Sequence, residues 1–147
     1  MTPIEPDERQ FSEVAAIAGG DSDGPVVMLN LNNYRERAEY AEDPPGGESI
    51  DVSGQEAYMR YGAVAAAVLE RVGGRILWHT ASKRTVIGDE TDRYDEVIAV
   101  WYPTLAAFAA LATDPELLAV RHHRVAALER AALICCESGA EPVLAGA

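Results

Sequence analysis

The chain has 147 residues, 48% of them hydrophobic, and its 24 acidic and 12 basic side chains give a formal net charge of −12. This length and apolar content suit one globular domain with its own core, and the excess of acid argues against nucleic acid or an anionic membrane surface as a partner. No apolar run is long enough to span a membrane, and the acidic, proline-containing start is unlike a signal peptide, so we expect a cytoplasmic protein.

Residues 1–24 contain two prolines and the glycine-rich stretch 19–24, a composition typical of an arm followed by a linker. Phe11, Val14, Ala15 and Ala18 would share one face of a short helix, within an arm that we expect to be partly ordered at most. We assign residues 25–138 to the folded domain and residues 139–147 to a short, loose tail.

The domain begins with a predicted strand at residues 25–32, whose nearly continuous apolar run indicates that both of its faces are covered. Residues 33–53 form an unusually long connection, and such loops are commonly functional or mobile. Ser53 and Glu56 have the spacing of a capping box and predict the start of a helix. Its apolar face runs from Tyr58 to Val72, and a glycine pair at 73–74 ends it.

Three strands and two helices complete the predicted order. Residues 75–82 and 94–102 predict strands, joined by a polar connection in which Thr85-Val86-Ile87 are able to extend the sheet. Thr104 caps a short helix that ends at Ala112, and Asp114-Pro115 begins a second helix to about Leu128. Residues 131–137 predict the fourth strand.

The order β-α-β-β-α-β predicts an α+β, ferredoxin-like fold, with a four-stranded antiparallel sheet and helices on one face only. The other face would meet water, yet the first and third predicted strands are apolar in both registers. A second sheet from an isologous homodimer is the simplest cover. The alternative is that the N-terminal arm crosses the sheet instead.

The two cysteines, Cys135 and Cys136, are adjacent in the fourth predicted strand. A disulfide between neighbouring strand residues would be strained, so we expect reduced, packed thiols. No third ligand lies nearby in the sequence, so a zinc site is not indicated, and no metal is expected.

A set of short motifs occurs in a fixed order between residues 25 and 138. They include Tyr58-x-x-Tyr61-Gly62, Gly73-Gly74-Arg75-Ile76-Leu77-Trp78, Tyr102-Pro103-Thr104 and His123-Arg124-x-Ala126-Ala127-Leu128. As a set they resemble the domain-of-unknown-function 1330 family, of the dimeric α/β-barrel superfamily. The resemblance implies a homodimer but no particular reaction, because that superfamily holds cofactor-independent monooxygenases, isomerases, haem enzymes and proteins without assigned activity. No motif matches the haem-binding branches, so we expect no cofactor.

In this fold the usual ligand site lies between the helices and the sheet. Asn30 and Asn32 interrupt an apolar strand, and either hold a loop or face a ligand. Tyr58 and Tyr61 lie on the inner face of the first predicted helix, where they either pack in the core or orient a substrate. Trp78 is also a candidate for binding substrate. Because Trp78 and His79 are adjacent on a strand, they face opposite ways.

The run Arg121-His122-His123-Arg124 is the most suggestive stretch for chemistry. On a helix, Arg121 and Arg124 are neighbours, while His122 and His123 diverge by about 100°. The family resemblance selects His123 as the inward residue, where it would act as a general base beside Arg124, an anion-binding group. The alternative is a cluster of cations that stabilises the C-terminus of the helix.

These residues support three functional hypotheses. In the first, the protein is a cofactor-independent enzyme for a small apolar or aromatic carbonyl compound, with His123 as base and Asn30, Tyr58, Tyr61 and Arg124 positioning the substrate. In the second, it is a dimer that binds a small molecule without changing it. In the third, it is a structural dimer whose cavity is filled by its own side chains.

Overall fold

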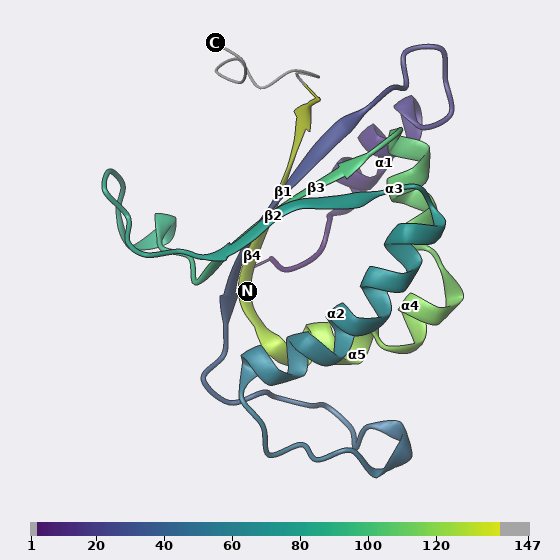
Figure 1. The fold of residues 1–147 in the computed structure, drawn as a ribbon. Coiled ribbons are helices and arrows are strands. Elements are labelled where there is room, and N and C mark those ends of the chain that lie inside the picture. Colours follow the sequence, from purple (N-terminus) through teal and green to yellow (C-terminus); the bar gives the residue numbers. More distant parts are fainter. Residues whose placement is uncertain (1–2, 139–147) are drawn as a thin grey trace.

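The computed structural model describes residues 3–138, so the predicted tail lies outside the described residues (Figure 1). The strands are β1 (Val26–Tyr34), β2 (Arg75–Ala81), β3 (Glu96–Tyr102) and β4 (Leu128–Glu137). The helices are α1 (Glu8–Ile17), α2 (Gly54–Arg71), α3 (Leu105–Ala112), α4 (Pro115–Ala119) and α5 (Arg121–Ala127), with short 3-10 turns at Pro45–Gly47 and Glu90–Asp92.

The four strands form one antiparallel sheet in the order β2-β3-β1-β4. Figure 1 shows α1 to α5 on one side of this sheet, and only the β2–β3 connection with its short 3-10 turn projects on the other. The α+β, ferredoxin-like prediction is therefore confirmed. Two helices start at the predicted capping residues. Ser53 accepts a hydrogen bond from the backbone N–H of Glu56 and Thr104 accepts one from that of Ala107, each at 3.0 Å.

The helix predicted from Asp114 to about Leu128 is wrong in its extent. It breaks at Val120, whose φ of −112° and ψ of 7° leave helical geometry, so that α4 and α5 are separate. Strand β4 then begins at Leu128, three residues before the predicted start, because Leu128 pairs with Tyr34 at the end of β1. Leu117 and Val120 pack against the core, while α5 packs along α2. This tertiary packing outweighs the helical propensity of the continuous sequence.

Thr85-Val86-Ile87, which the sequence allowed as an extension of the sheet, do not extend it. These residues lie in the β2–β3 connection outside any strand, and Val86 and Ile87 are 87% and 93% exposed. In Figure 1 this connection projects on the side of the sheet that carries no helices. Two large apolar side chains therefore stand in solvent beside the uncovered face.

The main core lies between the sheet and the helices. Its buried members include Met28 of β1, Ile98 and Val100 of β3, and Val68 and Leu69 of α2. Side chains along a strand point alternately to its two faces, so the residues two positions from Met28 and from Ile98 also face the helices. This alternation determines which polar residues reach the interior.

The N-terminal arm is more ordered than the sequence predicted. Asp7 and Gln10 form a capping box that begins α1, and Val14 and Ala18 pack against the main core. The carboxylate of Asp23 accepts from the backbone N–H of Leu105 at 2.6 Å, which fastens the linker to the start of α3. The arm thus joins the helix layer and does not cross the opposite face of the sheet.

The opposite face is apolar, and nothing in residues 3–138 covers it. The strand register places Leu29 between Ala99 and Ile134 on this face, and Ile134 is 47% exposed. The expectation of packed thiols is wrong for Cys135, which is exposed because β4 is an edge strand; both thiols are free.

Candidate functional site

Polar residues replace apolar ones at one end of the inner sheet face. Asn30, Asn32 and Tyr34 follow Met28 at alternate positions of β1 and therefore face the helices. Asn32 is only 2% exposed. In the register of the sheet, Asn32 pairs with Glu96 of β3, which brings a second polar residue to the same place.

Glu96 is the centre of a hydrogen-bonded group that joins three strands. The Tyr34 hydroxyl of β1 donates to Oε1 of Glu96, and Nε2 of His79 on β2 lies 2.7 Å from Oε2 of the same carboxylate. Glu96 is 9% exposed, whereas the His79 side chain is 50% exposed. One buried carboxylate thus contacts both a phenol and an imidazole, and such a group can take up and pass on protons.

Burial raises the pKa of Tyr34, and its hydrogen bond to Glu96 and the negative charge of that carboxylate raise it further. Tyr34 therefore stays neutral at physiological pH and donates a hydrogen bond to Glu96. The carboxylate keeps this donor in place, so that Tyr34, Glu96 and His79 form one connected group.

Three of the sequence-predicted residues lie beside this group. The Tyr58 ring is 5.3 Å from that of Tyr34 and 5.6 Å from that of Tyr61, measured between centroids. Burial raises the pKa of both Tyr58 and Tyr61, while the positive charge of Arg124 opposes the rise at each hydroxyl. The structure thus places Tyr58, Tyr61 and Arg124, three of the candidate residues, near one another.

The two asparagines of β1 have different surroundings. The Asn30 amide donates to the carbonyl oxygens of Met28 and Ile98, both at 3.3 Å, so it holds neighbouring strands. The Asn32 amide lies near the hydroxyls of Tyr34 and Tyr58 and acts to lower the pKa of each. Within the described residues, however, its Nδ2 has no acceptor at the distance and angle of an ordinary hydrogen bond. Asn32 is therefore a buried amide beside the hydroxyls of Tyr34 and Tyr58.

His123 faces inward as predicted, at 3% exposure, but toward the long connection (residues 35–53) rather than toward Glu96. Its Nδ1 lies 2.7 Å from the Tyr40 hydroxyl and its Nε2 lies 3.3 Å from Oε1 of Glu48. Arg60 of α2 also donates to the Tyr40 hydroxyl, at 3.1 Å. Burial, followed by the charge of His122, lowers the pKa of His123.

Trp78 lies on the face opposite to the Glu96 group. It pairs with Ala99 on the uncovered face and is 49% exposed, whereas His79 pairs with Ile98 and contacts Glu96. A bulge between Ile76 and Trp78 shifts the register but leaves Trp78 and His79 on opposite faces. Trp78 is thus separated from the other predicted binding residues.

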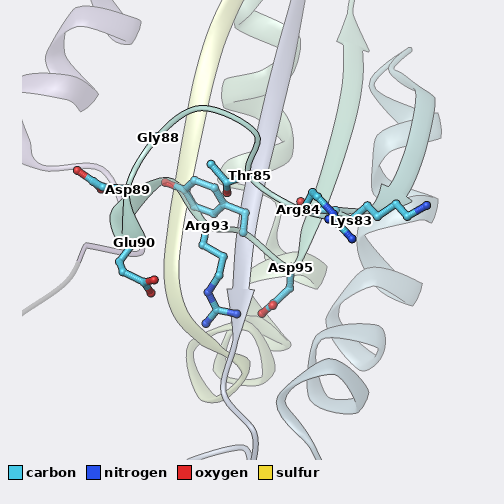
Figure 2. Close-up of a pocket in the computed structure, with 10 residues that line it drawn as sticks. Lys83, Arg84, Thr85, Gly88, Asp89, Glu90, Arg93 and Asp95 are labelled. Carbon is cyan, nitrogen blue, oxygen red and sulfur yellow. The ribbon is translucent and has the colours of Figure 1, made fainter.

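Two hollows lie around the β2–β3 connection. The larger, of about 600 Å³, is lined by Ser82, Lys83, Arg84, Thr85, Gly88, Asp89, Glu90, Arg93, Tyr94 and Asp95 (Figure 2). Figure 2 shows its charged side chains diverging, with Lys83 pointing away from Asp89 and Glu90. The smaller, of about 360 Å³, is also lined mainly by charged side chains of both signs. Neither hollow has convergent polar groups of the kind that define a ligand site.

Within residues 3–138, no group of three His, Cys, Asp or Glu side chains is placed to hold a metal ion. None of the described helices is long and apolar enough to cross a membrane. The Glu96 group is thus the main concentration of buried polar chemistry outside the His123 contacts.

The family model described as a domain of unknown function, DUF1330, matches residues 48–137. The chain belongs to the DUF1330 family. The resemblance recognised in the sequence is confirmed, although the family model begins after β1 rather than at residue 25. No curated protein matches this DUF1330 chain.

Two solved structures resemble this DUF1330 protein over nearly its whole length. The crystal structure of RPA0582, a protein of unknown function from Rhodopseudomonas palustris, is 32% identical with a TM-score of 0.79, and the match covers 93% of this chain and 97% of that one. The structure of methylated RPA0582 is 33% identical with a TM-score of 0.79, and covers 99% and 98%. These matches therefore include the N-terminal part of the chain.

Sequence reasoning missed Tyr34, His79 and Glu96 as a group. One signal was available, since Tyr34 continues the alternation of Asn30 and Asn32 along β1. Glu96 likewise comes directly before an apolar strand run, at a position that faces the helices. Their meeting depends on the register of three strands, which a single sequence does not specify.

Proposed function

We propose that this DUF1330 protein is a homodimeric enzyme that transfers a proton, without a cofactor, on a small carbonyl compound with an apolar or aromatic body. The observation that carries this proposal is the buried Glu96 carboxylate held between Tyr34 and His79. Buried, hydrogen-bonded titratable groups of this kind are concentrated at functional sites.

Glu96, assisted by His79, takes a proton from the carbon next to the carbonyl group. The negative charge that develops on the carbonyl oxygen needs donors that are already in place. The Asn32 amide, which lacks an ordinary hydrogen bond, and the neutral Tyr58 hydroxyl supply them. In this proposal the base is Glu96 with His79. His123 instead connects α5 to Tyr40 and Glu48 of the long connection.

The residues around the Glu96 group favour a flat substrate. Tyr34, Tyr58 and Tyr61 present a row of aromatic rings with centroids 5.3 and 5.6 Å apart. Aromatic surfaces pack well against flat apolar bodies. Arg124, beside the tyrosine hydroxyls, adds a positive charge for an anionic group of the substrate.

The proposed homodimer pairs the two uncovered sheet faces. The support is the apolar face around Leu29 and Ile134, which the N-terminal arm leaves open. Val86 and Ile87, nearly fully exposed on the same side of the sheet, would reach across to the partner and become buried. An isologous pairing covers all of this surface at once.

The test measures exchange of protons for deuterium next to a carbonyl group, by NMR in D₂O. Acetophenone, phenylpyruvate and levulinate serve as probes for three kinds of carbonyl compound. We expect catalysed exchange with at least one probe and a loss of about 100-fold or more in Glu96→Gln. Glu129→Gln, which changes an exposed carboxylate in β4, is the matched control and should exchange normally.

Three outcomes would contradict the proposed mechanism. Exchange that is no faster than in buffer would remove the enzymatic proposal, and saturable binding of a probe without exchange would indicate a binding protein instead. Loss of exchange in His123→Gln, with normal exchange in Glu96→Gln, would return the role of base to His123.

A further inference from the structure

The segment before α1 lies beside the proposed ligand site. In Figure 1 the first described residues lead into α1 on the side of the sheet that carries the α-helices. Glu5 in this leading segment (residues 3–7) forms an ion pair with Arg121 of α5. The contact brings a carboxylate of the N-terminal arm to the helix that carries Arg124.

Glu5 and Arg121 are in direct contact, and Arg124 and Tyr61 lie near enough to interact with them through charge. Arg121 and Arg124 are three residues apart, so they are neighbours on one face of α5. The charges of Arg124 and Arg121 oppose the burial-driven rise in the pKa of Tyr61, and the charge of Glu5 adds to that rise. Glu5 and the two arginines therefore act on the same hydroxyl, at the edge of the row of tyrosine rings.

The leading segment is anchored at its C-terminal end, where α1 begins. Helix α1 packs on the core through Val14 and Ala18, and Asp23 fastens the following linker to α3. Pro3 and Pro6 flank Ile4 and Glu5, and each restricts the backbone around the carboxylate. The backbone that carries Glu5 is thus anchored and restricted, which keeps the carboxylate near Arg121.

We infer that Arg121, Arg124 and Tyr61 form a subsite for the carboxylate of a small ligand, and that Glu5 occupies this subsite when no ligand is bound. The ligand class is a monocarboxylate with a flat, apolar body, because arginines pair with carboxylates and the tyrosine rings lie alongside. This inference rests on the proposed ligand site between the helices and the sheet.

The internal carboxylate is a weak competitor. The Glu5 and Arg121 side chains are 35% and 49% exposed, and ion pairs this open to water contribute little. A pair of this kind reduces the affinity for a ligand by no more than about fivefold. The arm therefore weakens binding of a carboxylate without preventing it.

The test compares benzoate with its neutral analogue benzamide on the full chain, with dissociation constants measured by NMR titration. We expect Glu5→Gln to bind benzoate about two- to fivefold more tightly than the unchanged protein, and benzamide equally well. Glu8→Gln, a charge change in the exposed first turn of α1, is the matched control and should leave both constants unchanged. Arg121→Gln should weaken binding of benzoate far more than binding of benzamide.

Equal affinity of the unchanged protein and Glu5→Gln for benzoate would overturn the inference, as would an equal gain for benzamide. Failure of benzoate to bind any variant would overturn it as well. The exchange assay judges the proposed function separately, because catalysed exchange that depends on Glu96 would stand even if Glu5 had no effect on benzoate.

Discussion

Nδ1 of His123 lies 2.7 Å from the hydroxyl of Tyr40, and this contact fastens the long connection to helix α5. Backbone hydrogen bonds from Arg35 to Ala127, at 2.8 Å, and from Glu39 to Ala126, at 2.9 Å, join the same two segments. The connection is therefore docked on the helix layer, and its Tyr40 contacts the buried side chain of His123.

His123 should make the stability of the protein depend on pH. Its pKa is lowered by burial in the native state, whereas the unfolded chain has an ordinary histidine pKa of about 6.5. Below that pH the unfolded state binds more protons, so the free energy of unfolding falls as pH is lowered from about 7.5 to about 5.5. Urea unfolding across this range measures the slope.

His123→Gln should flatten this slope because it removes the titrating group. Tyr40→Phe is the control, since it loses the same hydrogen bond but keeps the imidazole. A slope that is unchanged in His123→Gln would assign the pH dependence to other residues.

Gly54 should not tolerate a side chain. A Cβ at this position would contact the carbonyl oxygen of Arg35 and lie 2.7 Å from that of Ala127, and both are backbone atoms that cannot easily move. We expect Gly54→Ala to lower the free energy of unfolding by about 3 kcal/mol. Gly62→Ala, in the same helix with open space around it, should raise it by about 0.5–1 kcal/mol. Similar effects of the two changes in urea unfolding would refute the steric argument.

Asn32→Leu should separate stability from function. Replacing a buried donor without an ordinary hydrogen bond by an apolar side chain of similar size should stabilise the fold by about 1 kcal/mol. The same change should lower the rate of proton exchange, because a donor to the carbonyl oxygen is lost. Asn30→Leu removes an amide that makes two hydrogen bonds and should instead destabilise the protein. A loss of stability in Asn32→Leu would show that its amide is satisfied in the native state.

Leu29→Glu should produce a monomer if the uncovered sheet faces pair. A charge placed between Ala99 and Ile134 would be buried without a partner in the proposed interface. Sedimentation equilibrium measures the mass of the assembly. Met59→Glu, on the helix side where the methionine is 67% exposed, should leave the dimer intact. A monomeric unchanged protein, or a dimer that survives Leu29→Glu, would exclude this interface.

Local features of the sequence predicted the elements well. Ser53, Thr104 and Asp114 each satisfy backbone N–H groups within the next few residues, so the starts of their helices depend on neighbouring positions only. Asn30, Asn32 and Tyr58 were recognised as inward-facing for a similar reason, because alternation along a strand and spacing along a helix are local. The break at Val120 was missed, since it depends on how α5 packs against α2.

The sequence by itself determined the order of the elements, the caps of the main helices and the faces on which the polar residues lie. Only the tertiary structure decided which of those residues meet. Strand register joined Tyr34 and His79 through Glu96, and the docking of the long connection placed Tyr40 against His123. The physical reason is distance along the chain: caps and alternation act within a few residues, whereas Glu96 is 62 positions from Tyr34 and His123 is 83 from Tyr40.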